Sequence, residues 1–317
     1  MNRNDAVAIA TKILKEIMVY RRRLNHHAEH GDEEDNEVIN VQLPRFLKLV
    51  ERGDPVQFVR PAFPTKSPNS AKVLGILPDM AERLSLKFLE MFCQRIQQIY
   101  SPGAHIRICS DGHVFSDLIS VDDDVVDKYQ KSIEDMVASI GATHLSTYSL
   151  RDVSDFSLHG RDYNAQRKLL VKHYAKPEYE IKTELTSDEK GLHLYRNITR
   201  FLYEDSLFPG REESKTTLRK DAKRRAVSVV QRSWAWGNLL NAQFPSAIRL
   251  SIHPQPTDSI KIGIHMLPTK DDWLTPWHGV AANLNGNFVL MKNAEAQRLN
   301  GELVMVQGAP SHYVINT

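Results

Sequence analysis

The chain has 317 residues, of which 41% are hydrophobic and 25% charged, so its composition is that of a folded globular protein and not of a disordered one. Its 41 Lys and Arg residues barely exceed its 39 Asp and Glu residues, and a net charge of +2 argues against a nucleic-acid-binding protein. No apolar run reaches the roughly 18 residues of a membrane-spanning helix, and the N-terminus lacks the apolar core of a signal peptide. With only two cysteines, the sequence predicts a cytoplasmic protein without a disulfide framework.

The first part of the chain, about residues 1–55, is predicted to be helical. Apolar residues recur at helical spacing from about Asp5 to Leu24, which predicts a first helix. The acidic stretch His26–Glu37 indicates a solvated connection. Pro44 suits the first position of a second helix, and Val56–Val59 is typical of a short strand.

A strand–helix–strand unit comes next. Pro61–Pro68 is a Pro-rich loop, and Asp79 with Glu82 forms a capping-box pattern that starts a helix ending near Tyr100. The pattern then predicts a strand, a helix and a second strand at Ile106–Cys109, Asp122–Ile140 and Thr143–Leu150. This spacing is typical of a βαβ crossover, and it is the main reason for placing the chain in the α/β class.

The second half of the chain changes character at Phe244. Residues 162–243 predict about three helices, which we interpret as a mostly helical insertion over about 160–243. Beyond it, short β-rich runs punctuated by Pro and Gly predict strands at Ala247–Ile252, Ile260–Met266, Phe288–Met291, Leu303–Val306 and Tyr313–Ile315. No stretch is typical of a linker, so we expect one domain spanning residues 1–317.

The turn Ser110-Asp111-Gly112 is the most informative local feature. It ends a predicted strand, and Gly permits a sharp turn there. Polar groups at the carboxyl edge of an open α/β sheet stand where ligands bind, so we expect Asp111 to carry a proton and Ser110 to donate a hydrogen bond. The alternative is an ordinary Asp-Gly turn. Asp117 either caps a turn or joins the site.

Three polar residues, Arg249, Ser251 and His253, alternate along a predicted strand and therefore point to one face of it. An Arg, a hydroxyl and an imidazole on one face suit anion binding and proton transfer. The alternative is an ordinary solvated sheet face. Farther along, Trp277 and His278 favour a wall for a planar substrate and an acid or base, or else a buried aromatic anchor beside a satisfied histidine.

Several cations are candidates for holding anions. Lys66 stands on the stiff Pro-rich loop, and Lys261 opens a predicted strand, so both are placed to bind a phosphate. Arg232 lies beside two tryptophans, which partly shield it from water. The basic run Arg219–Arg225 is more typical of a solvated helix face.

No Walker loop, Gly-x-Gly-x-x-Gly, Cys-x-x-Cys or His-Glu-x-x-His motif occurs, so the residues predict no nucleotide or metal site. His26, His27 and His30 precede an acidic run, which favours solvated histidines over metal ligands.

Five longer motifs, taken together, resemble the isonitrile (isocyanide) synthases of the pyoverdine/dityrosine biosynthesis family. They span roughly Phe63 to Val280 in this order: Phe63–Asn69, Cys109–Asp117, Ile248–Gln255, Lys261–Ile264 and Thr275–Gly279. One departure is His113, where Arg is common in the family, so no role is assigned to that position.

The resemblance implies a modified Rossmann-like fold and a reaction without a metal or redox cofactor. In that reaction the amine of an aromatic L-amino acid condenses with the C2 ketone of ribulose 5-phosphate. The imine then fragments, losing the phosphate and the remaining sugar carbons, and one sugar carbon stays on the nitrogen as the isonitrile. Family frequency favours tyrosine over tryptophan. An iron/2-oxoglutarate oxygenase is the implied neighbour in secondary metabolism.

The resemblance and the residues together give a set of expected roles. Asp111, His253 and His278 are the candidate proton carriers. The expected substrate-binding residues are Lys66 and Lys261 for the sugar phosphate, Arg249 or Arg232 for the carboxylate, Ser110 and Ser251 for hydrogen bonds, and Trp277 for the aromatic pocket. Another sugar-phosphate lyase or isomerase with the same cationic pocket is the alternative, followed by a nucleic-acid-binding module that uses Arg219–Arg225.

Overall fold

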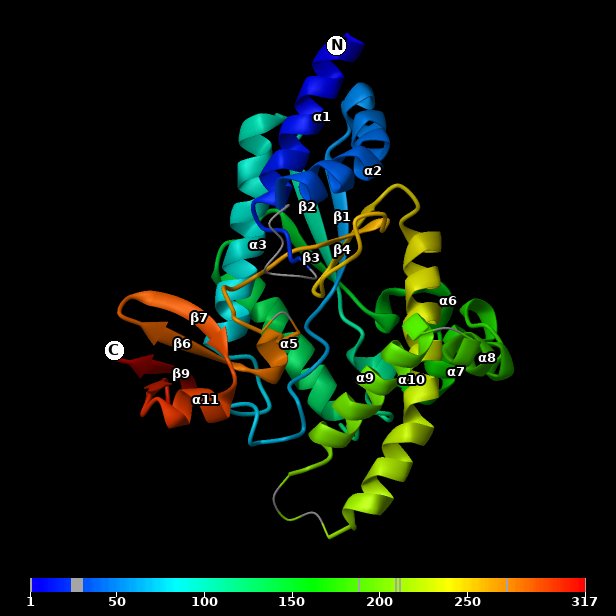
Figure 1. Ribbon diagram of the computed structural model, residues 1–317, viewed down its shortest axis with the longest axis vertical. Helices are drawn as coiled ribbons and strands as arrows, with labels where there is room; N and C mark the ends of the chain where they lie inside the picture. The colour runs from blue at the N-terminus through cyan, green and yellow to red at the C-terminus, as the bar shows by residue number, and fades with distance from the viewer. Residues whose placement is uncertain are drawn as a thin grey trace.

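The computed structural model describes residues 2–23, 31–187, 189–208, 210, 212–271 and 273–316. Its centre is a five-stranded sheet in the order β3-β2-β1-β4-β5, and every neighbouring pair of strands is parallel (Figure 1). In chain order the strands are β1 (Val56–Pro61), β2 (Ala104–Cys109), β3 (Leu145–Tyr148), β4 (Ile248–Ser251) and β5 (Lys261–Gly263). The predicted α/β class and the βαβ unit that ends in β3 are therefore confirmed.

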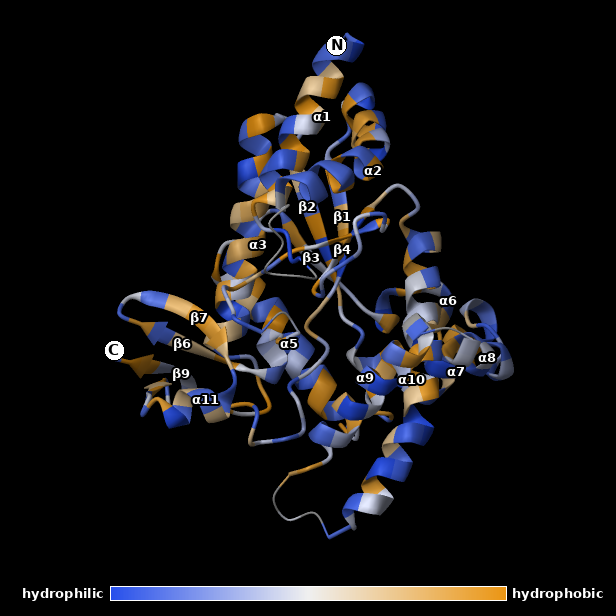
Figure 2. Ribbon diagram, in the orientation of Figure 1, coloured by the Kyte–Doolittle hydropathy of each residue, from blue (hydrophilic) through white to orange (hydrophobic). Residues whose placement is uncertain are grey.

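Helices cover both faces of this sheet because each face carries alternate apolar side chains. One face packs against α1 (Arg3–Met18), α2 (Gly31–Arg52), α3 (Met80–Ile99) and α5 (Asp123–Ser139) in the largest cluster of buried residues. The other face packs against α7 (Tyr163–Tyr174) and α10 (Lys215–Gln243). In Figure 2 hydrophobic residues recur along the strands and the helices beside them, whereas the outer end of α10 is mostly hydrophilic.

The segment between β3 and β4 is helical, as predicted, and lies to one side of the central sheet (Figure 1). It contains four long helices where the sequence predicted about three: α7, α8 (Glu178–Ser187), α9 (Glu189–Asp205) and α10. Two short elements precede them, the 3₁₀ turn η1 (Leu150–Asp152) and α6 (Ser154–Ser157). Ser214 caps α10, and its hydroxyl accepts from the N–H of Thr217.

The last part of the chain forms a separate four-stranded sheet in the order β7-β6-β9-β8. Its strands are β6 (Val280–Leu284), β7 (Asn287–Met291), β8 (Glu302–Val306) and β9 (Ala309–Ile315), with α11 (Asn293–Arg298) between β7 and β8. The sequence did not predict β6, because Val280-Ala-Ala-Asn-Leu284 has only one β-branched residue and no aromatic residue to mark a strand. The 3₁₀ turn η2 (Pro276–His278) joins this sheet to the central one.

Two predictions for the N-terminal region were wrong. The helix α2 begins at Gly31 and already includes the acidic run up to Glu37, because carboxylates are favourable in the first turn of a helix. Pro44 therefore lies inside α2 instead of opening a helix. His26, His27 and His30 lie outside the described residues. None of the described helices is long and apolar enough to cross a membrane.

After α1 the chain runs along the open edge of β5. Arg21 forms an antiparallel bridge with Ile264, and the N–H of Arg22 donates to the carbonyl of Gly263 at 2.8 Å. The N–H of His265 donates in turn to the carbonyl of Tyr20. This short segment covers the backbone groups that an edge strand otherwise exposes.

A buried ionic cluster fixes the loop that follows β1. The ammonium of Lys66, which is 2% exposed, lies 2.8 Å from Asp79 and 2.8 Å from Glu82, the two capping-box residues of α3. It also donates to the carbonyl of Pro276 at 3.2 Å. Tyr129 of α5 donates to the second oxygen of Glu82, and burial raises the pKa of Glu82 even beside the lysine.

Replacing Lys66 with Met should lower the free energy of unfolding by about 3 kcal/mol, because two buried carboxylates then lose their counter-ion. Urea unfolding of K66M and of wild type measures this difference. The matched control is K131M, since Lys131 is 67% exposed and its loss should leave stability nearly unchanged. A K66M protein as stable as wild type would contradict a structural role for this cluster.

Candidate active site

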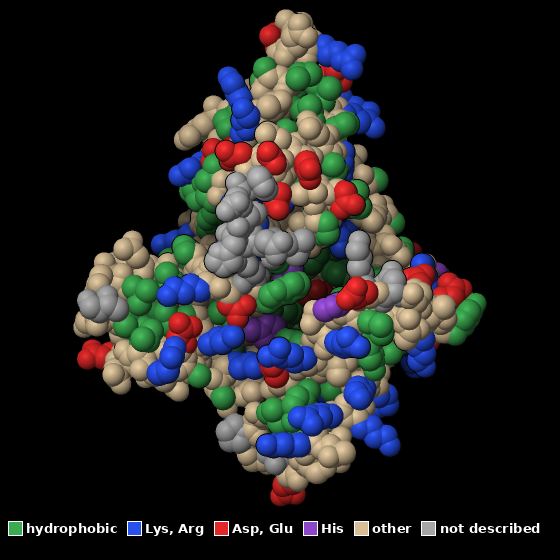
Figure 3. Space-filling model, in the orientation of Figure 1, with side chains coloured by type: hydrophobic (Ala, Val, Ile, Leu, Met, Phe, Trp, Pro, Cys, Tyr) green, Lys and Arg blue, Asp and Glu red, His purple; other side chains and the backbone are tan. Residues whose placement is uncertain are grey.

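Some of the polar residues singled out by the sequence, among them Ser110, Asp111 and His253, follow the carboxyl ends of strands in the central sheet. The sheet order places β1 and β4 side by side while β2 and β5 extend in opposite directions, so the β1/β4 boundary is a topological switch point. Ligands of open α/β sheets bind at this kind of crevice. Figure 3 shows a hollow near the middle of this face, with histidine side chains in it and a band of Lys and Arg beside it.

The turn Ser110-Asp111-Gly112 packs tightly against the loop that follows β1. A Cβ atom on Gly112 would lie 2.2 Å from the carbonyl oxygen of Pro64, so only glycine fits there. The hydroxyl of Ser110 donates to the carbonyl of Phe63 at 3.0 Å and accepts from Gln130 at 2.7 Å. Close packing and a hydrogen bond therefore hold this turn against the loop after β1, at the carboxyl edge of the sheet.

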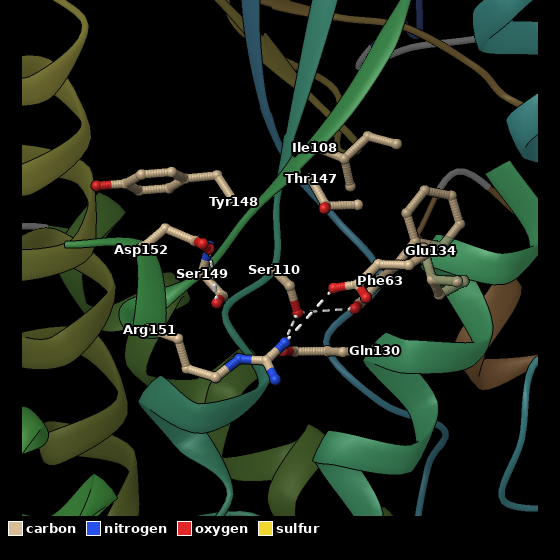
Figure 4. A pocket seen from close by; sticks show the side chains of 11 residues that line it. Phe63, Ile108, Ser110, Gln130, Glu134, Thr147, Tyr148, Ser149, Arg151 and Asp152 are labelled. Carbon is tan, nitrogen blue, oxygen red and sulfur yellow. Dashed lines mark hydrogen bonds and ion pairs between the residues drawn. The ribbon is translucent and has the colours of Figure 1, made fainter. Parts of the chain in front are cut away.

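A small cavity opens beside this turn, between the ends of β2 and β3 and helix α5 (Figure 4). Ser110, Gln130 and Arg151 line it, and Arg151 donates to the Gln130 amide oxygen at 3.1 Å. Phe63 and Ile108 give it an apolar wall. The hydroxyl of Ser110 therefore faces a cavity, as expected for a hydrogen-bonding group of a site.

Asp111 has the properties of a general acid or base. Its side chain is partly accessible and accepts no hydrogen bond from another of the described residues. Protein surrounds it closely enough that lost hydration raises its pKa from 3.8 to about 7. A carboxyl group with a pKa near neutrality accepts and donates protons with similar ease, which fits the role expected of Asp111.

His253 and His278, expected from separate motifs, lie in one electrostatic neighbourhood. Burial, followed by the charges of Arg22, His278 and Arg60, lowers the pKa of His253 to about 3, so its imidazole is neutral at physiological pH. Its Nδ1 atom is buried without a hydrogen-bond partner among the described residues. This environment favours His253 as a neutral hydrogen-bonding group over a proton carrier.

His278 is held by two neighbours. Its Nδ1 lies 2.8 Å from the hydroxyl of Thr275, and its Nε2 lies 3.5 Å from a carboxylate oxygen of Asp205 at the end of α9. Burial opposes ionisation of Asp205, but His278 and Lys72 together lower its pKa below the ordinary value. A histidine oriented by a carboxylate is suited to proton transfer.

Two expected contact residues belong to the scaffold of the site. Trp277 is 3% exposed and packs its ring edge-on to Phe63 at 5.4 Å, which matches the alternative of a buried aromatic anchor. Lys66 donates to Glu82 and to the carbonyl of Pro276, and its ammonium forms an ion pair with Asp79. Its contacts therefore do not support the expected role in binding phosphate.

The remaining expected cations are also engaged elsewhere. Arg232 forms an ion pair with Asp117, with 3.0 Å between Nη2 and Oδ2. The carboxylate of Asp117 is therefore bound to Arg232. Arg249 points toward α10, where it donates to the carbonyl of Gly237 at 3.0 Å and to Asn241 at 2.8 Å. The structure therefore does not bring either arginine to the histidines.

Ser251 and Lys261 do not form a common binding face with Arg249 and His253. The strand β4 ends at Ser251, so the expected alternation stops before His253. The hydroxyl of Ser251 accepts from the N–H of His253 at 3.1 Å and shapes the turn there. Lys261 is exposed at the start of β5, which in a parallel sheet is the end opposite the site.

Two arginines of the site were missed. Arg60 and Arg22 line a second, mostly apolar cavity close to His253. Arg60 follows the predicted strand Val56–Val59, and its place at a strand end, before Pro61, is the one sequence signal that could have drawn attention to it. Arg22 carries no such signal, because only the tertiary fold brings the end of α1 to this edge.

His113, where the family resemblance departs, has a structural environment. Its ring stacks on Tyr163 at 3.7 Å, and its Nε2 lies 3.2 Å from Asp127. Burial lowers its pKa to about 4, so it is neutral and buried in the packing of α4 (Gly112–Phe115). Within the described part of the chain no three His, Cys, Asp or Glu side chains form a metal-binding group.

The raised pKa of Asp111 predicts how stability depends on pH. Because the folded state favours the protonated acid, the wild type should lose stability as pH rises from about 4 to about 7, and D111N should lack this loss. Urea unfolding at several pH values measures the gap between the two proteins, with D124N as the matched exposed control. A gap that stays constant over this range would refute the shift.

The known proteins that are similar to this chain come from the family that its motifs resemble. Residues 47–304 match the family described as pyoverdine/dityrosine biosynthesis protein. The chain is 58% identical to the L-tyrosine isonitrile synthase of Xenorhabdus nematophila, over 99% of this chain and 93% of that protein. It is 54% identical to the L-tyrosine isonitrile synthase of Pseudomonas aeruginosa, over 96% and 94%.

More distant relatives include the L-tryptophan isonitrile synthase AmbI1 of Fischerella ambigua, at 39% identity over 97% of this chain and 95% of that protein. The crystal structure of the PvcA protein from Pseudomonas aeruginosa matches with a TM-score of 0.92 and 53% identity, covering 97% of this chain and 99% of that one. Since the family match covers most of the chain and the fold agrees throughout, this protein belongs to the pyoverdine/dityrosine biosynthesis family.

Proposed function

We propose that this protein is an isonitrile synthase that converts the amine of L-tyrosine into an isonitrile, with ribulose 5-phosphate as the carbon donor. The observation that carries the proposal is Asp111, a partly accessible carboxyl group at the switch-point edge with a pKa of about 7. Two relatives above 50% identity are named L-tyrosine isonitrile synthase, which supports the reaction and the amino acid.

The proposed chemistry needs proton transfer more than any other form of catalysis. The amine attacks the C2 ketone, and water leaves as the imine forms, so a group must first donate and then accept a proton. Asp111 is suited to both steps because its two protonation states are similarly populated near neutral pH. His278, oriented by Asp205, is placed as a second proton carrier for the fragmentation that breaks the carbon–carbon bond.

The finer parts of the proposal rest on the family resemblance and on the relatives. Tyrosine is favoured over tryptophan because the tyrosine enzymes are the more similar relatives, at 58% and 54% against 39% identity. The reaction requires no redox cofactor or metal. The enzyme acts in the cytoplasm in a pathway of secondary metabolism, next to an iron/2-oxoglutarate oxygenase that consumes the isonitrile.

The purified protein should form an isonitrile when incubated with ribulose 5-phosphate and L-tyrosine, and L-tryptophan should give at least about tenfold less product. Mass spectrometry of each mixture measures this directly. Ribulose 5-phosphate alone should not be consumed, and its consumption without an amino acid would favour a sugar-phosphate lyase or isomerase instead. Absence of any isonitrile would overturn the proposed function.

Replacing Asp111 with Asn should reduce turnover by about 10²- to 10⁴-fold while leaving the fold intact, because the amide cannot exchange the proton. Initial rates of isonitrile formation and circular dichroism measure the two effects. The matched control is D124N, a side chain 78% exposed on α5, which should keep wild-type turnover. Near-normal rates in D111N would remove Asp111 from the mechanism.

A further inference from the structure

Arg60 is a buried cation without an acidic partner. It is fully buried at the carboxyl end of β1, and its guanidinium donates only to the carbonyls of Ser251 and Ile264, both at 3.3 Å. Its Nε atom is buried without a hydrogen bond, and no carboxylate of the described residues forms an ion pair with it. Buried charges are normally paired, so the guanidinium of Arg60 has charge and hydrogen-bond donors that the described residues leave unpaired.

Other buried arginines of the chain show the ordinary arrangement. Arg167 pairs with Asp123 at 3.0 Å, and Arg21 pairs with Asp35 at 2.7 Å. Arg249 also lacks a carboxylate, but it points to α10 and is not among the side chains that line the cavity beside Arg60. The combination of full burial, long hydrogen bonds and a cavity is therefore particular to Arg60 among these.

The cavity beside Arg60 has positive charge at one end and apolar walls elsewhere. Arg22 lines it together with Arg60 and donates to the carbonyls of Ile252 and Leu274. Desolvation, followed by the charge of Arg22, lowers the pKa of Arg60 to about 9. Apolar residues form the walls: Ile252, Ile264, Met266, Leu267, Leu274 and Leu290.

We propose that Arg60, supported by Arg22, binds the carboxylate of the amino-acid substrate; this deepens the proposed function and rests on it. A guanidinium fork pairs with a carboxylate through two parallel hydrogen bonds, and Arg60 has donors whose present bonds are long. The phosphate group of a sugar phosphate is the alternative anionic ligand for Arg60. The apolar walls favour the carboxylate, because a monoanion costs less to desolvate than a phosphate dianion.

The guanidinium groups of Arg60 and Arg22 form a binding position for an anion, which we call the anion seat, and its place fits the proposed chemistry. Arg60 lies on β1, and the turn with Asp111 follows β2, the adjacent parallel strand. The Arg60 guanidinium donates to the carbonyls of Ser251 and Ile264, so a carboxylate bound there lies on the β4 side of β1, whereas Asp111 lies on the β2 side. The α-amine then has to point across the end of β1 toward Asp111. His253, neutral and unpartnered at Nδ1, borders the same cations. An anion at the seat would therefore also raise the pKa of His253.

The seat is tested by isothermal titration calorimetry with R60K, which keeps the charge but loses the planar fork. We expect R60K to bind L-tyrosine about 10- to 100-fold more weakly than wild type and to bind ribulose 5-phosphate unchanged. Tyramine, which lacks the carboxylate, should bind both proteins equally weakly. The matched control is R45K, because Arg45 also donates to two main-chain carbonyls, at 2.9 Å each, but lies away from the cavity.

Two results would overturn the seat: unchanged tyrosine affinity in R60K, or loss of ribulose 5-phosphate binding instead, which would assign the seat to phosphate. If circular dichroism shows that R60K is unfolded, the seat is tested instead by NMR of wild-type protein with labelled histidine rings. L-tyrosine, but not tyramine, should then shift the His253 ring signals, assigned with H253Q. Unshifted signals would overturn the seat.

The same experiments separate the seat from the proposed function. Wild type that makes the isonitrile while R60K keeps the KM for tyrosine refutes the seat alone. Wild type that binds tyrosine through Arg60 but forms no isonitrile refutes the reaction and leaves the seat standing.

Discussion

Lys66 joins parts of the molecule that are far apart in sequence. Its ammonium contacts Asp79 and Glu82 at the start of α3 and the carbonyl of Pro276 in η2, while Tyr129 of α5 donates to the same glutamate. The loop after β1 therefore has one position relative to both sheets. Since the turn Ser110-Asp111-Gly112 packs on that loop, the position of Asp111 depends on this buried ion cluster.

The carboxyl edge separates two opposite electrostatic environments. On the β2 side, loss of hydration favours the neutral acid of Asp111, whereas on the β4 side burial and two arginines favour the neutral imidazole of His253. Desolvation shifts both groups toward their uncharged forms, so His253 is neutral near neutral pH and Asp111 is about half protonated. The same physical cause acts on an acid and on a base in opposite directions.

Much of the fold was predictable from the sequence, because capping boxes, βαβ spacing and apolar periodicity are local signals. The helix after Asp79 and the strand before Ser110 are examples. The role expected of Asp111 stays a prediction. The partners of Lys66 and Arg232 were not predictable, since a cation beside a loop or a tryptophan looks the same whether its carboxylate comes from a distant helix or from a ligand. Arg60 was missed because burial, not residue type, makes it unusual.

The few residues after α1 perform two tasks at once. Arg21 and the backbone of Arg22 seal the open side of β5, and the side chain of Arg22 reaches into the cavity of the site. An unsealed parallel edge is a template on which other chains can assemble. A change in this short segment therefore alters both the covered edge of β5 and the charge of the cavity beside Arg60.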